Sequence, residues 1–258
     1  MDKKSIALIK EELKAATVTE LPFVIEKYQE DERSGVQALL TKAKKQIEKL
    51  EQEKARIEKL REYENRYEEE YEYICGIDEV GRGPLAGPVV ACAVILPKGC
   101  RMLYINDSKQ LSEKKREALC AQIKEEAVAV GIGMVGPGRI DEINILQATY
   151  EAMRQAIENL SVKPDILLND AVTIPEVTIR QVPIIKGDAK SISIGAASIV
   201  AKVTRDHLME EYAKVMPEYG FDSNKGYGSA AHIAAIREYG LTPIHRRSFV
   251  KNLLTEEK

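Results

Sequence analysis

The chain changes character near residue 72, and this change constrains its architecture more than any other feature. Residues 36–70 are rich in Glu and Lys, contain no proline or glycine, and carry apolar side chains at intervals of three and four, which is the pattern of an amphipathic helix. Residues 5–15 show a similar helical pattern. Beyond residue 72, short β-branched segments alternate with helical ones. We therefore expect an α-helical N-terminal extension over residues 1–72 and an α/β domain over residues 73–258.

The long charged stretch predicts one continuous helix or a hairpin of helices. The tyrosines at positions 63, 67 and 71 continue its apolar stripe, which consists of Val36, Leu40, Ala43, Ile47, Leu50, Ile57 and Leu60. A dimeric coiled coil is the alternative, because its seam also needs apolar residues every three to four positions. The repeat is irregular after Leu50, which favours a helical appendage that packs on the domain or projects from it.

The second part of the chain has the alternation of an α/β protein. Apolar, β-branched runs predict strands at residues 73–78, 88–96, 129–135, 166–169 and 178–183. Ser112 is the expected N-cap of the first of four predicted helices, which cover residues 112–128, 140–160, 191–216 and 229–239. Strands that first follow one another directly and then alternate with helices predict a mixed β-sheet flanked by helices.

Composition excludes several classes of protein. No run of about 18 apolar residues could cross a membrane, and the first residues lack the apolar core of a secretory signal. The four cysteines have neither metal-binding nor paired spacing, so we interpret them as small buried side chains in a reducing compartment. We expect a cytoplasmic monomer without a membrane partner. The net charge of −3 neither supports nor excludes nucleic acid, but residues 225–258 hold six basic side chains against three acidic ones.

The segment Gly76–Pro84 places two acids at the end of an apolar strand. Asp78 and Glu79 run directly into a glycine-rich turn, and buried carboxylates are costly unless they are paired or bound to metal. Adjacent side chains on a regular strand point to opposite faces, so both acids can face inward only if the chain turns there. The glycines permit such a turn and let backbone N–H groups approach a phosphate. Without further context such a pair is more often a solvated strand end, so this motif is only moderately specific.

Two further acids occur in similar settings. Asp170 closes the apolar run Ile-Leu-Leu-Asn-Asp, and Asp188 lies just before a helix that opens with small residues. Two-metal hydrolysis of a phosphodiester needs several carboxylates that converge on ions about 3.5–4 Å apart, and Mg²⁺ takes oxygen ligands of this kind. Either acid alone could equally be a cap or a solvated loop residue. Asp206 competes with Asp188 for this role, and we interpret it as a helix-surface acid that pairs with a base.

Five segments, in order, resemble the signature segments of ribonuclease HII. They are residues 78–97 (DEVGRGPLAGPVVACAVILP), residues 106–112 (NDSKQLS), the strand end LLND, residues 186–206 (KGDAKSISIGAASIVAKVTRD) and the Lys-Gly-Tyr-Gly turn at residues 225–228. The resemblance covers about residues 73 to 250 and implies the ribonuclease H-like mixed sheet. The extension over residues 1–72 looks like the helical extension of some bacterial members.

The resemblance also implies a role for individual residues. The catalytic, metal-holding carboxylates of the family fall on Asp78, Glu79, Asp170 and Asp188, and the implied cofactor is a divalent metal, Mn²⁺ or Mg²⁺. The Gly-Arg-Gly turn falls on Gly81, Arg82 and Gly83, where backbone groups would meet the ribonucleotide's 2′-OH, the group that distinguishes RNA from DNA. The substrate-sensing tyrosine falls on Tyr227. Lys109 resembles a lysine that contacts phosphate.

The implied activity is that of an endoribonuclease. Its substrates would be RNA/DNA hybrids and duplex DNA with single embedded ribonucleotides, cut on their 5′ side by a two-metal mechanism that gives 5′-phosphate ends. Arg82, Lys109 and the basic C-terminal stretch would hold backbone phosphates without reading sequence. One alternative is a ribonuclease HIII-like enzyme that needs several consecutive ribonucleotides. Another is a catalytically silent nucleic-acid-binding protein, against which the four acids argue. A P-loop is excluded because neither glycine cluster continues as GK[ST].

Overall fold

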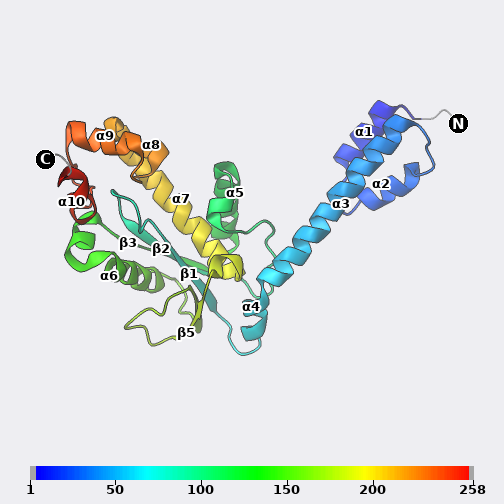
Figure 1. Ribbon diagram of the computed structural model, residues 1–258. Helices are drawn as coiled ribbons and strands as arrows, with labels where there is room; N and C mark the ends of the chain where they lie inside the picture. The colour runs from blue at the N-terminus through cyan, green and yellow to red at the C-terminus, as the bar shows by residue number, and fades with distance from the viewer. Residues whose placement is uncertain (1–3, 256–258) are drawn as a thin grey trace. The chain divides into compact units, whose positions relative to one another are not determined.

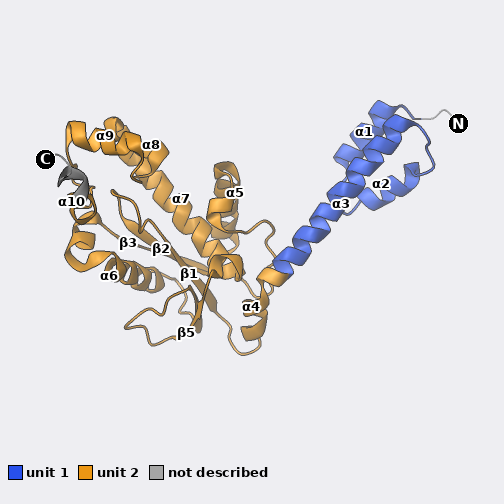
Figure 2. Cartoon of the chain, viewed as in Figure 1, with its two compact units in different colours: residues 1–58 blue, residues 59–258 orange. Residues whose placement is uncertain are grey.

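The computed structural model describes residues 4–255, and the chain forms two compact units. Figure 2 shows them as Met1–Glu58 and Lys59–Lys258. The first unit contains α1 (Ile6–Ala15), α2 (Leu21–Tyr28) and most of the long helix α3 (Ser34–Leu60). The first part of the stripe on α3 is covered by α1 and α2, because Val36, Leu40 and Ala43 share an apolar cluster with residues of these helices: Ile9, Leu21, Ile25 and Tyr28.

The second unit is built on a mixed sheet, as the sequence predicts. Its five strands lie in the order β3-β2-β1-β4-β5. They are β1 (Ile74–Val80), β2 (Val89–Ile95), β3 (Ala129–Val135), β4 (Ile166–Asp170) and β5 (Arg180–Ile184). The first three strands pair antiparallel, whereas β4 and β5 run parallel to β1. The parallel pairing brings the ends of β1 and β4 to the same edge of the sheet.

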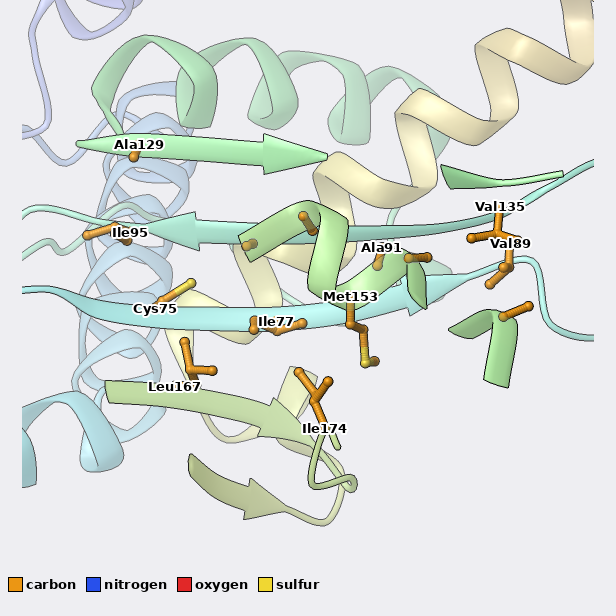
Figure 3. Close-up of a cluster of buried hydrophobic side chains, with 14 of the residues drawn as sticks. Cys75, Ile77, Val89, Ala91, Ile95, Ala129, Val135, Met153, Leu167 and Ile174 are labelled. Atoms are coloured by element: carbon orange, nitrogen blue, oxygen red, sulfur yellow. The ribbon is translucent and has the colours of Figure 1, made fainter. Parts of the chain in front are cut away.

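Two long helices cover opposite faces of this sheet (Figure 1). α6 (Pro137–Glu158) packs on the face that carries the odd-numbered residues of β1 and β2, and Figure 3 shows this core, in which Ile77 and Met153 are fully buried. α7 (Ile192–Val215) packs on the other face. Its approach is so close that a Cβ on Gly76 would lie 2.1 Å from the backbone carbon of Ser193. Glycine at this position therefore lets α7 begin directly against β1.

Shorter helices complete the second unit. They are α4 (Glu62–Tyr67), α5 (Glu113–Glu126), α8 (Phe221–Asn224), α9 (Ala230–Tyr239) and α10 (Arg247–Thr255), with 3-10 turns η1 (Ser108–Gln110), η2 (Gly187–Ala189) and η3 (Pro217–Tyr219). Ser112 has the backbone conformation of an N-cap on α5, but its side chain makes no capping hydrogen bond. Ser229 and Ser191 do cap α9 and α7. The sequence did not predict α2, α8 or α10.

The division between the compact units falls after Glu58, whereas the sequence predicts that the extension ends at residue 72. The difference is the segment of residues 59–72, which belongs to the second unit. Tyr63, Tyr67 and Tyr71 from this segment pack on an apolar cluster of the sheet and α7 that includes Ile74 and Ile194. The tyrosine stripe is therefore part of the core of the larger unit. Within residues 4–255, no helix combines the length and the apolar character needed to cross a membrane.

Candidate active site

The ends of β1 and β4 bring Asp78 and Asp170 together. The parallel register sets Ile77 opposite Asn169, so Asp78 and Asp170 follow as the next residues on neighbouring strands. Asp78 is 7% exposed. Burial raises the pKa of Asp78 well above its ordinary value, the charges of Glu79 and Asp170 raise it further, and a hydrogen bond from Ser198 opposes the shift. The strand thus holds a carboxylate where its charge is unfavourable without a cation.

Glu79 continues the same strand, because β1 runs to Val80 and pairs Glu79 with Ala91 of β2. The chain therefore turns after Val80, not between the two acids, so they point to opposite sides. Oε1 of Glu79 forms an ion pair with Arg82 at 3.2 Å. Burial raises the pKa of Glu79, Arg82 lowers it and the charge of Asp170 raises it. Glu79 thus shares the electrostatic environment of Asp170.

Asp188 reaches the same edge through the turn after β5. The N–H of Gly187 donates a hydrogen bond of 2.7 Å to Oδ1 of Asp170, which ties this turn to the end of β4. Asp188 is half-buried. Burial raises the pKa of Asp188, and the charges of Asp107 and Asp170 add to the rise, while Lys109 lowers it. All four predicted carboxylates and Lys109 therefore contribute to the electrostatics of one region. The structure adds Asp107 to this region, a residue for which the sequence alone predicts no role.

The donor set suits a hard divalent cation. All four side chains offer carboxylate oxygens, the ligands that Mg²⁺ and Mn²⁺ prefer, and the raised pKa values of Asp78, Glu79 and Asp188 record charges that a cation would offset. As placed, no three His, Cys, Asp or Glu side chains within residues 4–255 meet closely enough to form a finished metal centre. The residues therefore fit the metal by the chemistry of their oxygens and by their location at one end of the sheet.

Asp206, the competitor of Asp188, is occupied elsewhere. Its carboxylate pairs with Lys202 at 2.5 Å and lies 3.8 Å from Arg116. The predicted pairing with a base is confirmed, but the predicted surface position is wrong, because Asp206 is only 7% exposed. α7 packs on the sheet near its start and against α5 further along, so Asp206 faces α5 and not solvent.

A buried arginine donates hydrogen bonds to the backbone of the Gly-Arg-Gly turn. Arg246 is 0% exposed, and its guanidinium donates to the backbone carbonyls of Gly81, Arg82 and Gly87. The basic C-terminal stretch is predicted from the sequence to hold backbone phosphates. For Arg246 this is wrong, because the side chain is enclosed and its donors are used on the turn. Arg247, the adjacent residue, is exposed.

A second buried arginine joins this turn to the Lys-Gly-Tyr-Gly turn. Arg205 donates to the carbonyls of Pro88, Ala86 and Lys225 at 3.0, 3.0 and 2.9 Å. Its side chain also lies against Gly81, where φ is +88° and a Cβ would lie 2.3 Å from Nε of Arg205. Two turns that are far apart in sequence are thereby fixed to each other. The sequence carries no clear signal for this role, because Arg205 lies between Thr204 and Asp206 in the charged second half of α7.

The predicted substrate-binding side chains are accessible to solvent. The side chain of Arg82 is 46% exposed, Tyr227 is 45% exposed, and Lys109 is exposed. The tyrosine ring lies over the Gly-Arg-Gly turn, because a Cβ on Gly83 would be 3.8 Å from Cε1 of Tyr227. The backbone and side-chain groups predicted to meet a ribonucleotide therefore lie at neighbouring positions.

Glu64 of α4 supports the start of α7, three residues beyond Asp188. It is 4% exposed, and its Oε1 accepts hydrogen bonds from the Ser191 hydroxyl at 2.5 Å and from the Ser193 N–H at 3.0 Å. Burial raises the pKa of Glu64, and these hydrogen bonds oppose the rise. No role for Glu64 is predicted from the sequence, because a glutamate in a charged helix carries no signal of burial.

Comparison with known proteins identifies two matching families. The family described as Ribonuclease HII matches residues 75–252, and the Ribonuclease HII N-terminal domain matches residues 5–68. The chain is 70% identical over 230 residues to a protein named Ribonuclease HII from Lachnoclostridium phytofermentans, covering 89% of this chain and 90% of the relative. It is 53% identical over 255 residues to one from Clostridioides difficile, covering 98% and 100%.

A solved structure supports the same relationship. The crystal structure of ribonuclease H2 from Pyrococcus horikoshii OT3 superposes with a TM-score of 0.58 at 28% sequence identity. The match covers 70% of this chain and 96% of that chain. The archaeal protein is thus similar over almost its whole length, while nearly a third of this chain lies outside the match.

Proposed function

Because the chain belongs to the ribonuclease HII family and is a metal-dependent endoribonuclease, we propose that it cuts duplex DNA on the 5′ side of single embedded ribonucleotides as well as the RNA strand of RNA/DNA hybrids. One observation carries this proposal. The exposed ring of Tyr227 lies over Gly83, in the turn that follows Asp78 and Glu79 by a few residues. An exposed ring that could contact the ribose therefore lies over the turn that directly follows two of the proposed carboxylates.

Asp78, Glu79, Asp170 and Asp188 are the proposed ligands of the metal, Mg²⁺ or Mn²⁺. When bound, a pair of such ions activates water and stabilises the leaving 3′-oxygen, which leaves a 5′-phosphate. The protein's own contribution is to hold the carboxylates at one sheet edge, through the β1–β4 pairing and the bond from Gly187 to Asp170. Arg82 pairs with Glu79 in the free protein, so a substrate phosphate that attracts Arg82 would release Glu79 for the metal.

The proposed substrate contacts divide into two kinds. Arg82 and Lys109 hold backbone phosphates, which position a duplex without reading its bases. The backbone of Gly81 and Gly83, together with Tyr227, meets the ribose, where the 2′-OH distinguishes RNA from DNA. The buried arginines Arg205 and Arg246 keep these turns in place. We expect cleavage without sequence preference.

The two alternatives are not favoured. Identity of 70% and 53% to proteins named Ribonuclease HII argues against a ribonuclease HIII-like enzyme, as does the Gly-Arg-Gly turn. The four acids at one edge argue against a silent binding protein. We further propose that the enzyme acts as a cytoplasmic monomer. Its four cysteines are free, three of them buried, which suits a reducing compartment.

The test is cleavage of a duplex that carries one ribonucleotide in otherwise DNA strands. We expect one cut on its 5′ side in Mg²⁺ or Mn²⁺, no cut in chelator, and no cut of the all-DNA duplex. A hybrid with a continuous RNA strand is the positive control. Cleavage of the hybrid without cleavage at a single ribonucleotide would reject the proposed substrate while leaving the family assignment intact.

A further inference from the structure

The backbone carbonyl of Tyr227 is hydrogen-bonded to the side chain of a buried histidine. Nδ1 of His232 lies 2.8 Å from the carbonyl oxygen of Tyr227. A carbonyl can only accept a hydrogen bond, so Nδ1 of His232 carries the proton. The neutral ring then has an unprotonated Nε2, which can only accept.

A second histidine supplies the matching donor. The N–H of Thr242 donates to Nδ1 of His245 at 2.9 Å, so that nitrogen is unprotonated and the proton of the neutral ring is on Nε2. Nε2 of His245 lies 3.1 Å from Nε2 of His232. The chain of hydrogen bonds therefore runs in one direction, from Thr242 through His245 and His232 to the carbonyl of Tyr227. Only one arrangement of protons on two neutral rings satisfies it.

The surroundings favour this neutral pair. His232 is 0% and His245 is 3% exposed, and both pack against the rings of Tyr219 and Phe221. Burial lowers the pKa of His232, and burial together with the neighbouring imidazole lowers the pKa of His245 to about 4. The hydroxyl of Tyr219 is directed away from the imidazoles, because it donates to the carbonyl of Gly240 at 3.0 Å.

The turn that carries Tyr227 needs such support. Glycines flank the tyrosine on both sides, and Gly226 has φ of +83°, with a Cβ position only 2.5 Å from the carbonyl oxygen of Ala86. The turn is fixed on the preceding side by Arg205, which donates to Lys225. On the following side the Tyr227 carbonyl accepts from the N–H of Ser229 at 2.8 Å and from His232. The histidine is thus the side-chain anchor behind a tyrosine whose own side chain is exposed.

We propose that His232 and His245 are positioning residues that hold Tyr227 over the Gly-Arg-Gly turn, so that its ring can contact the ribose of the substrate. Neither histidine reaches the surface, so neither touches the substrate. The inference rests on the proposed role of Tyr227 in recognising the ribonucleotide. It adds a buried pair, more than ten residues apart in sequence, whose effect on cleavage passes through that one side chain.

The test is a double-mutant cycle between His232 and Tyr227 in the full-length protein. His232→Leu removes the donor, whereas His232→Asn keeps an N–H near the position of Nδ1. Two quantities are measured for each variant: the single-turnover cleavage rate of a duplex with one ribonucleotide, and the affinity for that duplex in chelator. We expect His232→Leu to slow cleavage on the order of five- to tenfold, the scale of one lost hydrogen bond, with less than a twofold change in affinity. His232→Asn should restore most of the rate.

The Tyr227→Ala background separates positioning from general damage. If His232 acts through Tyr227, His232→Leu should change the cleavage rate less than twofold in that background. A full five- to tenfold loss there would overturn the inference while leaving the role of Tyr227 intact. If Tyr227→Ala alone leaves cleavage unchanged, the role of Tyr227 fails, and the positioning role fails with it.

A spectroscopic measurement tests the pair independently of activity. Nitrogen-15 NMR of the histidine rings should show His232 protonated at Nδ1 and His245 protonated at Nε2 at neutral pH. His245→Gln keeps a donor toward His232, so the Nδ1 signal of His232 should persist. Any other tautomer of His232 in the folded wild-type protein would overturn the inference. So would a His245→Gln protein in which the His232 signals are normal but cleavage at a single ribonucleotide is as slow as in Tyr227→Ala. If His232→Leu does not fold, His245→Leu and His245→Gln provide the same comparison.

Discussion

Arg246 donates to the backbone carbonyl of Gly81, and this contact supports the Gly-Arg-Gly turn from the protein interior. The same guanidinium also reaches the carbonyls of Arg82 and Gly87. Charged arginine is costly to bury without partners, so the two carbonyls of this turn and that of Gly87 compensate the guanidinium while it fixes them. Folding stability and the shape of the substrate-facing turn therefore depend on the same side chain.

The adjacent arginines should differ strongly in how much stability the same substitution costs. Arg246→Met should lower the free energy of unfolding by about 3 kcal/mol or more, because it leaves buried carbonyls without donors. Arg247→Met removes an exposed side chain and should change stability by less than about 0.5 kcal/mol. Urea unfolding of both variants measures the difference. Equal stability of the two variants would contradict the bracing role of Arg246.

Asp78→Asn should abolish cleavage, with a loss of roughly a hundredfold or more, while duplex binding in chelator stays nearly unchanged. The substitution removes a ligand charge with little change in volume. Without metal it should also raise the melting temperature, because the buried carboxylate charge is unfavourable in the folded state. Thermal unfolding with and without Mg²⁺, and a cleavage assay, measure both effects.

Asp206→Asn is the matched control for this metal site. It leaves the half-buried Lys202 without its carboxylate partner, so it should destabilise the protein by about 1–3 kcal/mol. Cleavage at a temperature where the variant is folded should keep the wild-type dependence on metal concentration. A shift in that dependence would assign Asp206, in place of Asp188, to the metal site.

We propose that residues 73–258 contain the complete catalytic domain, and two truncations test this. Residues 59–258 retain Glu64 and the tyrosine stripe, and should have the stability of the second unit and full activity. Residues 73–258 lose the hydrogen bonds that Ser191 and Ser193 donate to Glu64, and should melt several degrees lower, at about 2–4 °C per kcal/mol, but still cleave. A folded 73–258 fragment with no activity at any salt concentration would show that residues 59–72 belong to the catalytic domain.

Glu64→Ala and Glu64→Gln are the matched point variants for the truncation. Alanine leaves the buried N–H of Ser193 without an acceptor and should cost about 1–3 kcal/mol. Glutamine keeps an acceptor oxygen and should cost less. If both variants are as stable as the wild type, the loss in the 73–258 fragment must come from the tyrosines instead.

Stability should fall on acidification because of His245. Its pKa is lowered to about 4 in the folded protein, below the ordinary value of about 6.5. Between these values the unfolded chain binds more protons than the folded one, so the stabilisation is complete above pH about 6.5 and is lost as the pH falls toward 4. The slope should be at most about 1.4 kcal/mol per pH unit for this group. Urea unfolding of wild type and His245→Gln across this range should show a shallower slope for the variant.

Local pattern was sufficient to predict most of the architecture. The β-branched runs and the small-residue opening of α7 predicted strands and helices that the structure places within a few residues. Asp78 and Asp170 were identifiable because each ends an apolar run, and parallel strands deliver such ends to one edge. Burial periodicity and turn chemistry act over a few neighbouring residues, so a sequence records them directly.

Tertiary contacts decided what neighbouring residues of the same type do. Arg246 and Arg247 are equivalent in the sequence, but only the packing of the C-terminal segment under the Gly-Arg-Gly turn buries the first and exposes the second. Glu64 looks like any other acid of a charged helix until α7 supplies two donors from more than a hundred residues away. Burial of a charge depends on partners that are distant along the chain, and the free energy of placing it there is a property of the assembled fold alone.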